Sequence, residues 1–234
     1  MLSAIDAENF LAQGLSLMGL SLEKQPEALA RLSQYYQELK KWNRKINLVA
    51  RSLNDKDILE NHFLDSLSLI SLLPPETLEQ ETILDVGTGA GFPGLVLKAA
   101  FPALSVTLVD PRKNRFFFLK HIARVLHLKG VEVLDVRLEE KIKVKELSDR
   151  QFSFITSRAF TGINRFIKLA APYLAGEGSI VLMKGPGVVT ELNEFERKGR
   201  NENFVVTGIK KLYLPFSKNE RLLVSIRRSG DKLQ

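Results

Sequence analysis

The stretch TILDVGTGAGFPGLVL, residues 82–97, decides the fold of this chain. It opens with an apolar run that is typical of a buried strand and continues into a turn with three glycines, Gly87, Gly89 and Gly91. Pro93 follows, where the first turn of a helix tolerates proline because the missing N–H has no helical partner. Glycine permits positive φ and close approach of a ligand, and a helix N-terminus offers free N–H groups. The stretch therefore predicts a strand, a turn and a helix that together can cradle a nucleotide-like ligand.

Two acidic residues bear on the identity of that ligand. Asp85 lies on the strand itself, directly before the glycines, and Asp110 ends the next apolar run. A carboxylate favours a positively charged ligand over a pyrophosphate, and S-adenosylmethionine carries an ammonium and a sulfonium but no phosphate. The opposing interpretation is that Asp85 only braces the turn, as aspartates commonly do. We favour the methyl donor because the two acids end two successive strands.

The same turn allows a second interpretation. Gly89, Gly91 and Gly94 form G-x-G-x-x-G, with Asp110 about 20 residues beyond, which is the dinucleotide fingerprint. A nicotinamide-dependent oxidoreductase therefore stays open, although Asp85 and the lack of a recognisable hydride-transfer acid speak against it. A non-catalytic RNA-binding module that has kept the fold is another alternative, because a fold alone does not define an activity.

The composition limits the class of protein. A chain of 234 residues with 44% hydrophobic content can build one substantial α/β core with an appendage. No apolar run reaches the length of a membrane span, and the first residues do not resemble a secretory signal. Cysteine is absent and the three histidines are scattered, so neither a disulfide nor a metal site is expected. We expect a cytoplasmic protein without a metal, and nothing requires more than a monomer.

The net charge of +7 is unevenly distributed. Residues 1–80 hold 8 basic and 11 acidic residues, whereas the remainder holds 26 basic and 16 acidic ones. A basic catalytic part suits a polyanionic substrate, through phosphate contacts and electrostatic steering. The simpler interpretation is that such a charge only aids solubility. We favour a nucleic-acid substrate over the solubility interpretation.

The chain divides into two parts. Residues 3–71 show helical apolar spacing almost throughout, and Pro74 and Pro75 end them. We therefore predict an N-terminal helical extension over 1–75 and a second domain over 76–234. There, strand and helix patterns alternate, which predicts an α/β sheet. Strands are expected at 82–86, 105–110, 131–136, 152–157, 179–184, 204–213 and 221–227, helices at 93–100, 111–128, 163–173 and 188–199, and a turn at 176–178.

Ligands of parallel sheets bind outside the carboxyl ends of the strands, which directs attention to the residues that follow them. Leu138 and Glu139 follow the third strand and are predicted to bracket an adenine ring. Arg158 ends the fourth strand, and an ion pair with Asp85 or Glu139 is its structural alternative. Lys184 ends the fifth strand, where it contacts RNA phosphate or simply terminates the strand.

Two basic segments are predicted to contact RNA. The first, KKWNRKINLVAR at 40–51, has no acid and includes Lys41, Arg44 and Lys45 around Trp42, although this tryptophan is better explained as a packing anchor. The second begins the helix after Asp110 and contains Arg112, Lys113 and Arg115. Basic residues at a helix N-terminus oppose its dipole, and a contact with phosphate would explain them.

Eight segments in this order resemble the bacterial small-subunit (16S) ribosomal RNA guanine-N7 methyltransferases, the glucose-inhibited division protein B family. They are WNRKINL (42–48), NHFLDSL (61–67), DVGTGAGFPG (85–94), LVDPRKNRFFFL (108–119), RLEE (137–140), SRAF (157–160), MKG (183–185) and ERLLV (220–224). The glycine motif is shared with many methyltransferases, whereas the first, second and sixth segments are more specific. The resemblance implies a class I S-adenosylmethionine-dependent methyltransferase fold, Rossmann-like, with a mostly parallel seven-stranded sheet. The implied reaction methylates N7 of a guanosine in the 530 loop of 16S rRNA, in the small ribosomal subunit.

The resemblance also implies roles for single residues. It places Gly87 and Phe92 in the methyl-donor loop, Leu138 and Glu139 around the adenine, Asp110 near the ribose and Arg158 at the donor or target pocket. The sequence departs from the family after the acid, at Pro111, Arg112, Asn114 and Arg115, and at Asn61, where a basic residue is usual. Guanine N7 has a lone pair and no proton, so the reaction needs orientation rather than a general base. Arg158 is suited to position the target through guanine O6 or a phosphate.

Overall fold

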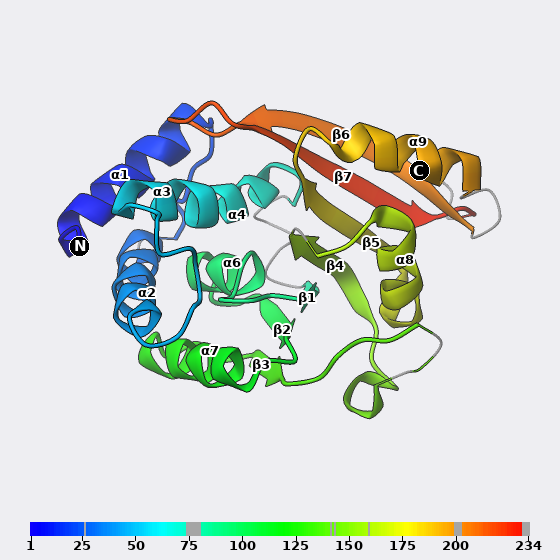
Figure 1. Cartoon of the computed structure of the whole chain (residues 1–234), viewed down its shortest axis with the longest axis horizontal. Helices are drawn as coiled ribbons and strands as arrows, with labels where there is room; N and C mark the ends of the chain where they lie inside the picture. Colours follow the sequence, from blue (N-terminus) through cyan, green and yellow to red (C-terminus); the bar gives the residue numbers. More distant parts are fainter. Residues whose placement is uncertain are drawn as a thin grey trace.

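The chain forms a seven-stranded sheet covered by helices (Figure 1). The computed structural model describes residues 1–25, 27–73, 81–140, 142, 144–158, 160–198 and 203–230, without the side chain of residue 198. The strand order is β3-β2-β1-β4-β5-β7-β6, with neighbours parallel from β3 to β5 and β7 antiparallel to both β5 and β6. The strands are β1 (Thr82–Val86), β2 (Ser105–Val109), β3 (Val131–Leu134), β4 (Phe152–Arg158), β5 (Leu174–Lys184), β6 (Phe204–Tyr213) and β7 (Glu220–Arg228). The mostly parallel seven-stranded sheet that the sequence predicts is confirmed.

Helices cover both faces of the sheet. The helices that follow strands are α6 (Gly94–Ala100), α7 (Lys113–Val125), α8 (Ile163–Ala170) and α9 (Val188–Lys198), with short 3-10 turns at η3 (Lys145–Leu147) and η4 (Ala171–Tyr173). Successive residues of a strand point to opposite faces, and in β1 Ile83 packs with α6 and α7 whereas Leu84 packs with α8 and α9. The sheet therefore has one apolar core on each side.

The N-terminal helices share the first of these cores. They are α1 (Ala4–Leu17), α2 (Ala28–Asn43), α3 (Asp55–Ile58), the π-helix η1 (Leu59–Leu64), α4 (Asp65–Leu67) and the 3-10 helix η2 (Ser68–Ser71). α2 packs against α6 and α7, and the buried Tyr35 on α2 donates a hydrogen bond to the Ala90 carbonyl in the glycine turn. The extension thus supports the turn directly. The predicted boundary near residue 76 lies outside the described residues, so the division into two domains stays a prediction.

Several element boundaries differ from the predictions. The turn predicted at 176–178 is wrong, because β5 begins at Leu174 and runs through both glycines. The pairing of β5 with β4 shifts from Phe152–Leu174 to Phe154–Ser179, so residues 175–178 form an irregularity within the strand rather than a reversal of the chain. β3 stops at Leu134, two residues before the predicted end, and residues 44–54 form turns rather than helix. Among the described residues, no helix is both long and apolar enough to span a bilayer.

Candidate functional site

The glycine turn between β1 and α6 depends on its glycines. Gly87, Gly89 and Gly91 have φ of +73°, +62° and +91°, which side chains strongly disfavour. At Gly87 an added Cβ would also collide with the ring of Phe160. The turn is fixed from below by Tyr35, as described above, and from the side by Asp110, which accepts a hydrogen bond from the Gly89 N–H at 3.1 Å.

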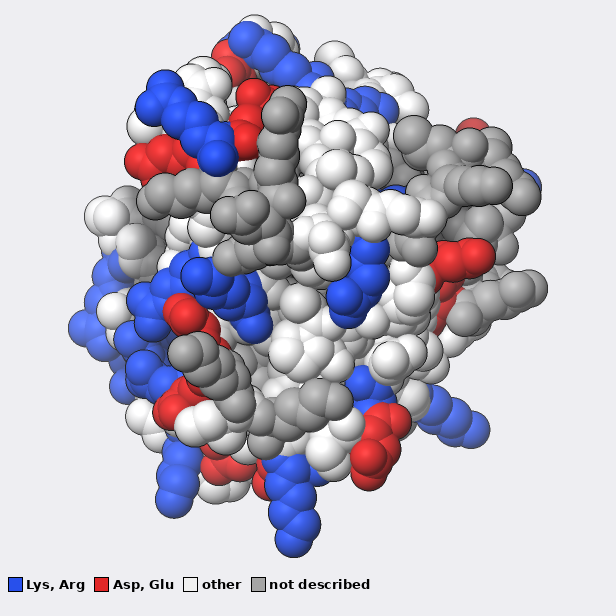
Figure 2. Space-filling view, turned by 90° about the vertical axis from the view of Figure 1, so that its right-hand side faces the viewer, with Lys and Arg blue, Asp and Glu red and all other residues white. Residues whose placement is uncertain are grey.

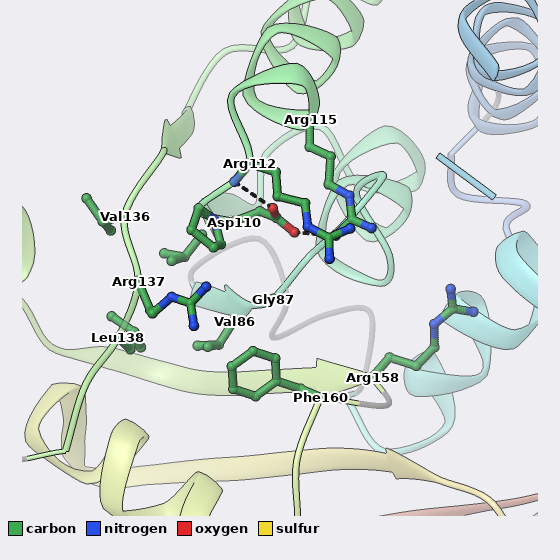
Figure 3. Close-up of a pocket in the computed structure, with 12 residues that line it drawn as sticks. Val86, Gly87, Asp110, Arg112, Arg115, Val136, Arg137, Leu138, Arg158 and Phe160 are labelled. Carbon is green, nitrogen blue, oxygen red and sulfur yellow. Dashed lines mark hydrogen bonds and ion pairs between the residues drawn. The ribbon is translucent and has the colours of Figure 1, made fainter. Parts of the chain in front are cut away.

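A cavity of about 280 Å³ opens beside this turn, at the carboxyl ends of β1 and β2 (Figure 3). Four residues predicted to bind the donor line it together, namely Gly87, Asp110, Leu138 and Arg158. The remaining lining residues are Val86, Val109, Pro111, Arg112, Arg115, Val136, Arg137 and Phe160. Asp85, Gly89, Gly91, Phe92 and Glu139 do not line it. Val136, Arg137 and Phe160 were not assigned a role from the sequence, although each flanks a residue or motif that was.

Asp110 holds the walls of the cavity in place. Its Oδ2 accepts hydrogen bonds from the Gly89 N–H and, at 2.7 Å, from Arg115 Nη1. Its Oδ1 accepts a bond of 3.0 Å from the backbone N–H of Arg112. A carboxylate offers about four lone-pair sites, so three bonds leave one for a ligand hydroxyl. The predicted ribose contact is therefore compatible with the bracing that the structure shows.

Asp85 is fully buried beneath the turn, and its two oxygens differ. Oδ2 accepts hydrogen bonds from the Thr88 hydroxyl at 2.6 Å and from the Gly94 N–H at 2.8 Å, so the bracing interpretation is correct for this oxygen. Oδ1 has no hydrogen-bond partner among the described residues. Burial raises the pKa of Asp85 to about 6, despite these hydrogen bonds and the nearby positive charge of Arg158. Asp85 lies outside the cavity lining, so it acts on a ligand there through its charge rather than through a direct contact.

Arg158 reaches the cavity from the end of β4, but its guanidinium points towards the N-terminal helices (Figure 3). Nη1 donates to the Asn61 carbonyl at 2.6 Å and forms an ion pair of 3.3 Å with Asp65. Nη2 donates to His62 Nδ1 at 2.8 Å. The ion pair considered from the sequence, with Asp85 or Glu139, is therefore replaced by one with Asp65. Sequence reasoning assigned no chemistry to Asp65 or His62, although both belong to the NHFLDSL segment.

An aromatic stack supports this arginine. The His62 ring lies parallel to the Phe92 ring at 4.8 Å between centroids, and the Arg158 guanidinium lies 5.1 Å from the centroid of the same phenyl ring. Burial lowers the pKa of His62 to about 3, with the charges of Arg158 and Arg221 acting in the same direction, so the imidazole is neutral at pH 7. Phe92 is buried under the glycine turn, where it supports the loop rather than lining the cavity.

Leu138 and Glu139 occupy different environments. Leu138 is buried and lines the cavity, as a residue packing on an adenine ring should. Glu139 is exposed, lies outside the cavity lining and pairs through its backbone with Ile142. The contact between Glu139 and an adenine ring therefore stays a prediction, because Glu139 lies outside the cavity lining.

The seven residues predicted to contact RNA fall into two groups. Lys184 is 11% exposed and donates to the Thr161 carbonyl at 2.7 Å and to Glu191 at 2.8 Å, which favours the alternative that it terminates the strand. Arg115 forms an ion pair with Asp110. The exposed residues are Lys41, which pairs with Glu38, and Arg44, Lys45, Arg112 and Lys113, which form no ion pair with another described residue. On the face in Figure 2, lysine and arginine side chains gather along one side, with acidic ones among them.

Known proteins resemble this chain over nearly its whole length. The family model for rRNA small subunit methyltransferase G matches residues 28–223. A ribosomal RNA small subunit methyltransferase G from Desulfotalea psychrophila is 39% identical over 96% of this chain and 100% of its own length. The chain belongs to this family. A second member, from Syntrophotalea carbinolica, is 37% identical over 94% of this chain and 98% of its own length.

Solved structures support the fold. The ribosomal protein L11 methylase of Lactobacillus delbrueckii subsp. bulgaricus has a TM-score of 0.51 and 15% identity, covering 72% of this chain and 78% of that one. The branched-chain polyamine synthase of Thermus thermophilus, solved with 5′-methylthioadenosine, has a TM-score of 0.57 and 13% identity over 83% of this chain and 63% of that one. At such identities the likeness shows the fold alone. The class I methyltransferase fold expected from the sequence is confirmed for this member of the methyltransferase G family.

Proposed function

We propose that this chain transfers the methyl group of S-adenosylmethionine to N7 of a guanosine in the 530 loop of 16S ribosomal RNA, within the small ribosomal subunit. The observation that carries the proposal is the cavity beside the glycine turn, which brings Gly87, Asp110 and Leu138 together, with the buried carboxylate of Asp85 beneath the turn. The negative charge of Asp85 attracts an ammonium group on a ligand in this cavity and would repel a pyrophosphate. Membership of the methyltransferase G family points to the same donor and the same class of substrate.

The residues of the cavity fit this donor. Gly87 lines the cavity without a side chain, so a ligand can approach its backbone, and an added Cβ would collide with Phe160, another lining residue. The free lone pair of Asp110 suits a ribose hydroxyl, and the apolar Leu138 suits one face of an adenine. Gly89, Gly91 and Phe92 act by shaping the turn, because they do not line the cavity. We retain Glu139 as a proposed donor contact on the family resemblance alone, since it lies outside the cavity lining.

The chemistry requires orientation and little else. The bound donor supplies an electrophilic methyl group on a sulfonium. The lone pair of guanine N7 forms the new bond to carbon while the carbon–sulfur electrons return to sulfur, and no proton has to move. We therefore assign no general base. We propose that Arg158 orients the target through guanine O6 or a phosphate, which requires its guanidinium to turn from Asp65 and His62 towards the cavity.

The remaining parts of the proposal follow from the substrate. A ribosomal substrate implies work in the cytoplasm, and the chemistry above needs no metal. We propose that one copy of the chain suffices, with residues 1–75 as an extension packed on the methyltransferase domain at 76–234. Lys41, Arg44, Lys45, Arg112 and Lys113 are the exposed cations proposed to contact the RNA backbone.

The decisive experiment uses labelled S-adenosylmethionine and small ribosomal subunits from cells that lack such a methyltransferase. We expect label in 7-methylguanosine at a single site of 16S RNA. Donor binding without transfer to subunits, assembly intermediates or free RNA would favour the non-catalytic RNA-binding alternative. Failure to bind the donor, together with oxidation or reduction of a nicotinamide cofactor, would instead favour the oxidoreductase.

A further inference from the structure

A second cavity adjoins the donor cavity. It has a volume of about 380 Å³ and is lined by Ile46, Asn47 and Leu48 on one side and by Arg112, Lys113, Asn114 and Arg115 at the start of α7 on the other. Arg112 and Arg115 also line the donor cavity, so these two side chains form the partition between the cavities. The two basic segments, residues 40–51 and the start of α7, thus meet at one groove.

We propose that this groove and the exposed face of α7 beyond it bind a single-stranded stretch of RNA that flanks the target nucleotide. The inference rests on the proposed function, because the donor cavity defines where the target lies. The flank-binding surface comprises Ile46, Asn47, Arg112, Lys113, Asn114, Phe117 and Lys120. None of these residues apart from Arg112 lines the donor cavity.

The charge of this surface is one-sided. From Pro111 to Val131 the sequence contains six lysines and arginines and no acidic residue. Arg112, Lys113, Lys120 and Arg124 are exposed, and none of them forms an ion pair with another described residue. Cations that no carboxylate neutralises suit a partner that supplies its own negative charge along a line, as a phosphate backbone does.

The groove combines apolar, amide and cationic side chains, which suit the base and the phosphate of a nucleotide. Ile46 and Leu48 give it an apolar side against which a base can pack. The side-chain amides of Asn47 and Asn114 each offer two donors and one acceptor to a base edge. Arg112 and Lys113 lie along the rim, where a phosphate between the two cavities would pass. A second nucleotide next to the target therefore fits this groove in both charge and chemistry.

Phe117 extends the surface by one turn of α7. Helix α7 turns Phe118, Leu119 and Ile122 into the core, whereas Phe117 is 58% exposed. Its ring lies 5.5 Å from that of Phe116 between centroids, at 79° between planes, and more than half of its surface stays open to solvent. Lys113 and Lys120 lie one turn to either side on the same face of the helix. An exposed aromatic ring between cations is the arrangement on which unpaired bases stack.

The test compares two substitutions on this surface with two matched controls. Phe117→Ala and Lys113→Gln are paired with Tyr213→Ala, which removes another exposed aromatic ring, and with Lys56→Gln, which removes another exposed cation. Tyr213 is the last residue of β6, which forms the sheet edge opposite to β3, the strand that α7 contacts. Figure 1 shows β6 at the top and α7 at the bottom. Affinity for protein-free 16S RNA and for unmethylated small subunits is measured over a range of salt concentrations, and donor affinity is measured separately.

We expect Phe117→Ala to weaken binding to both RNA forms by about 5- to 150-fold, with an unchanged salt slope, because stacking is not electrostatic. Lys113→Gln should lower the salt slope by about one phosphate contact. Neither change should alter donor affinity, and neither control should alter RNA affinity. Affinities at the wild-type level would overturn the inference, and loss of binding to subunits alone would assign the surface to a ribosomal protein instead. Failure of the unmodified chain to transfer methyl groups would count against the proposed function and not against these RNA affinities.

Discussion

The carboxylate of Asp65 and the guanidinium of Arg158 lie 93 positions apart in the chain and form an ion pair of 3.3 Å. The other oxygen of Asp65 accepts a hydrogen bond of 3.1 Å from Arg221 Nε. One buried carboxylate thus joins an N-terminal helix to the last residue of β4 and to the start of β7. It also fixes the arginine that we assign to positioning the target.

Asp65→Asn should destabilise the fold by about 3–5 kcal/mol, because two largely buried guanidinium groups lose the anion between them. Urea denaturation followed by circular dichroism measures this free energy of unfolding. Asp135→Asn, at an exposed aspartate, is the matched control and should stay within about 0.5 kcal/mol of the unmodified chain. Equal stability of the two variants would mean that Asp65 does not hold the arginines together.

Donor affinity should fall as the pH falls through about 6, the value to which burial raises the pKa of Asp85. Above that pH the carboxylate is ionised and attracts the donor ammonium, and below it the carboxyl is neutral. Calorimetric titration of S-adenosylmethionine from pH 5 to pH 8 follows the change. Asp85→Asn should bind the donor about tenfold more weakly at pH 8, for a loss of about 1.4 kcal/mol, and should show no such fall. A parallel fall in the variant would assign the pH dependence to another group.

Gly87→Ala should abolish measurable donor binding, since the added methyl group would collide with Phe160 at the mouth of the cavity and the backbone φ is +73°. Gly19→Ala separates the two causes, because its φ is +65° but nothing lies within 4 Å of the added methyl group. This control should cost about 1–2 kcal/mol of stability and leave donor affinity intact. Denaturation and calorimetry on both variants give the answer, and normal donor affinity in Gly87→Ala would exclude the close approach that we propose.

The stability of the chain should decrease as the pH is lowered from 6.5 towards 3, in part because of His62. Burial lowers the pKa of His62 to about 3. Between pH 6.5 and pH 3, this imidazole is therefore protonated in the unfolded chain but neutral in the folded chain. His62→Gln removes this contribution, and its melting temperature should decline less steeply between pH 7 and pH 5. An identical slope in His62→Gln and in the unmodified chain would show that the pKa of His62 is not lowered in the fold.

Lys184→Gln should act on stability rather than on RNA affinity. The substitution leaves Glu191 without its ion-pair partner and removes the bond to the Thr161 carbonyl, at a cost of about 1–3 kcal/mol. The salt slope of RNA binding should remain that of the unmodified chain. A slope lower by about one phosphate contact at unchanged stability would restore the RNA contact that the sequence suggested.

The sequence predicted those parts of the site that follow from local pattern. Gly87 and Asp110 directly follow β1 and β2, and Leu138 lies in the loop after β3. Parallel strands bring their carboxyl ends to one edge, so the position of the cavity could be predicted. The orientation of Arg158 was not, because its partners lie in a helical segment that nothing local connects to β4. The start of β5 was missed for a different reason. Gly176 is a turn signal by composition, yet residues 175–178 form an irregularity within β5 rather than a reversal of the chain.

The hydrogen bond from the Tyr35 hydroxyl to the Ala90 carbonyl limits how this architecture can be inherited. A glycine turn whose backbone carbonyl accepts a hydrogen bond from a tyrosine on a separate helix loses that bond when it is recombined without the helix. Recombination that attached this sheet to a different N-terminal appendage would have to supply a new group at the same position. The extension and the catalytic sheet are therefore expected to descend together, as a single heritable unit.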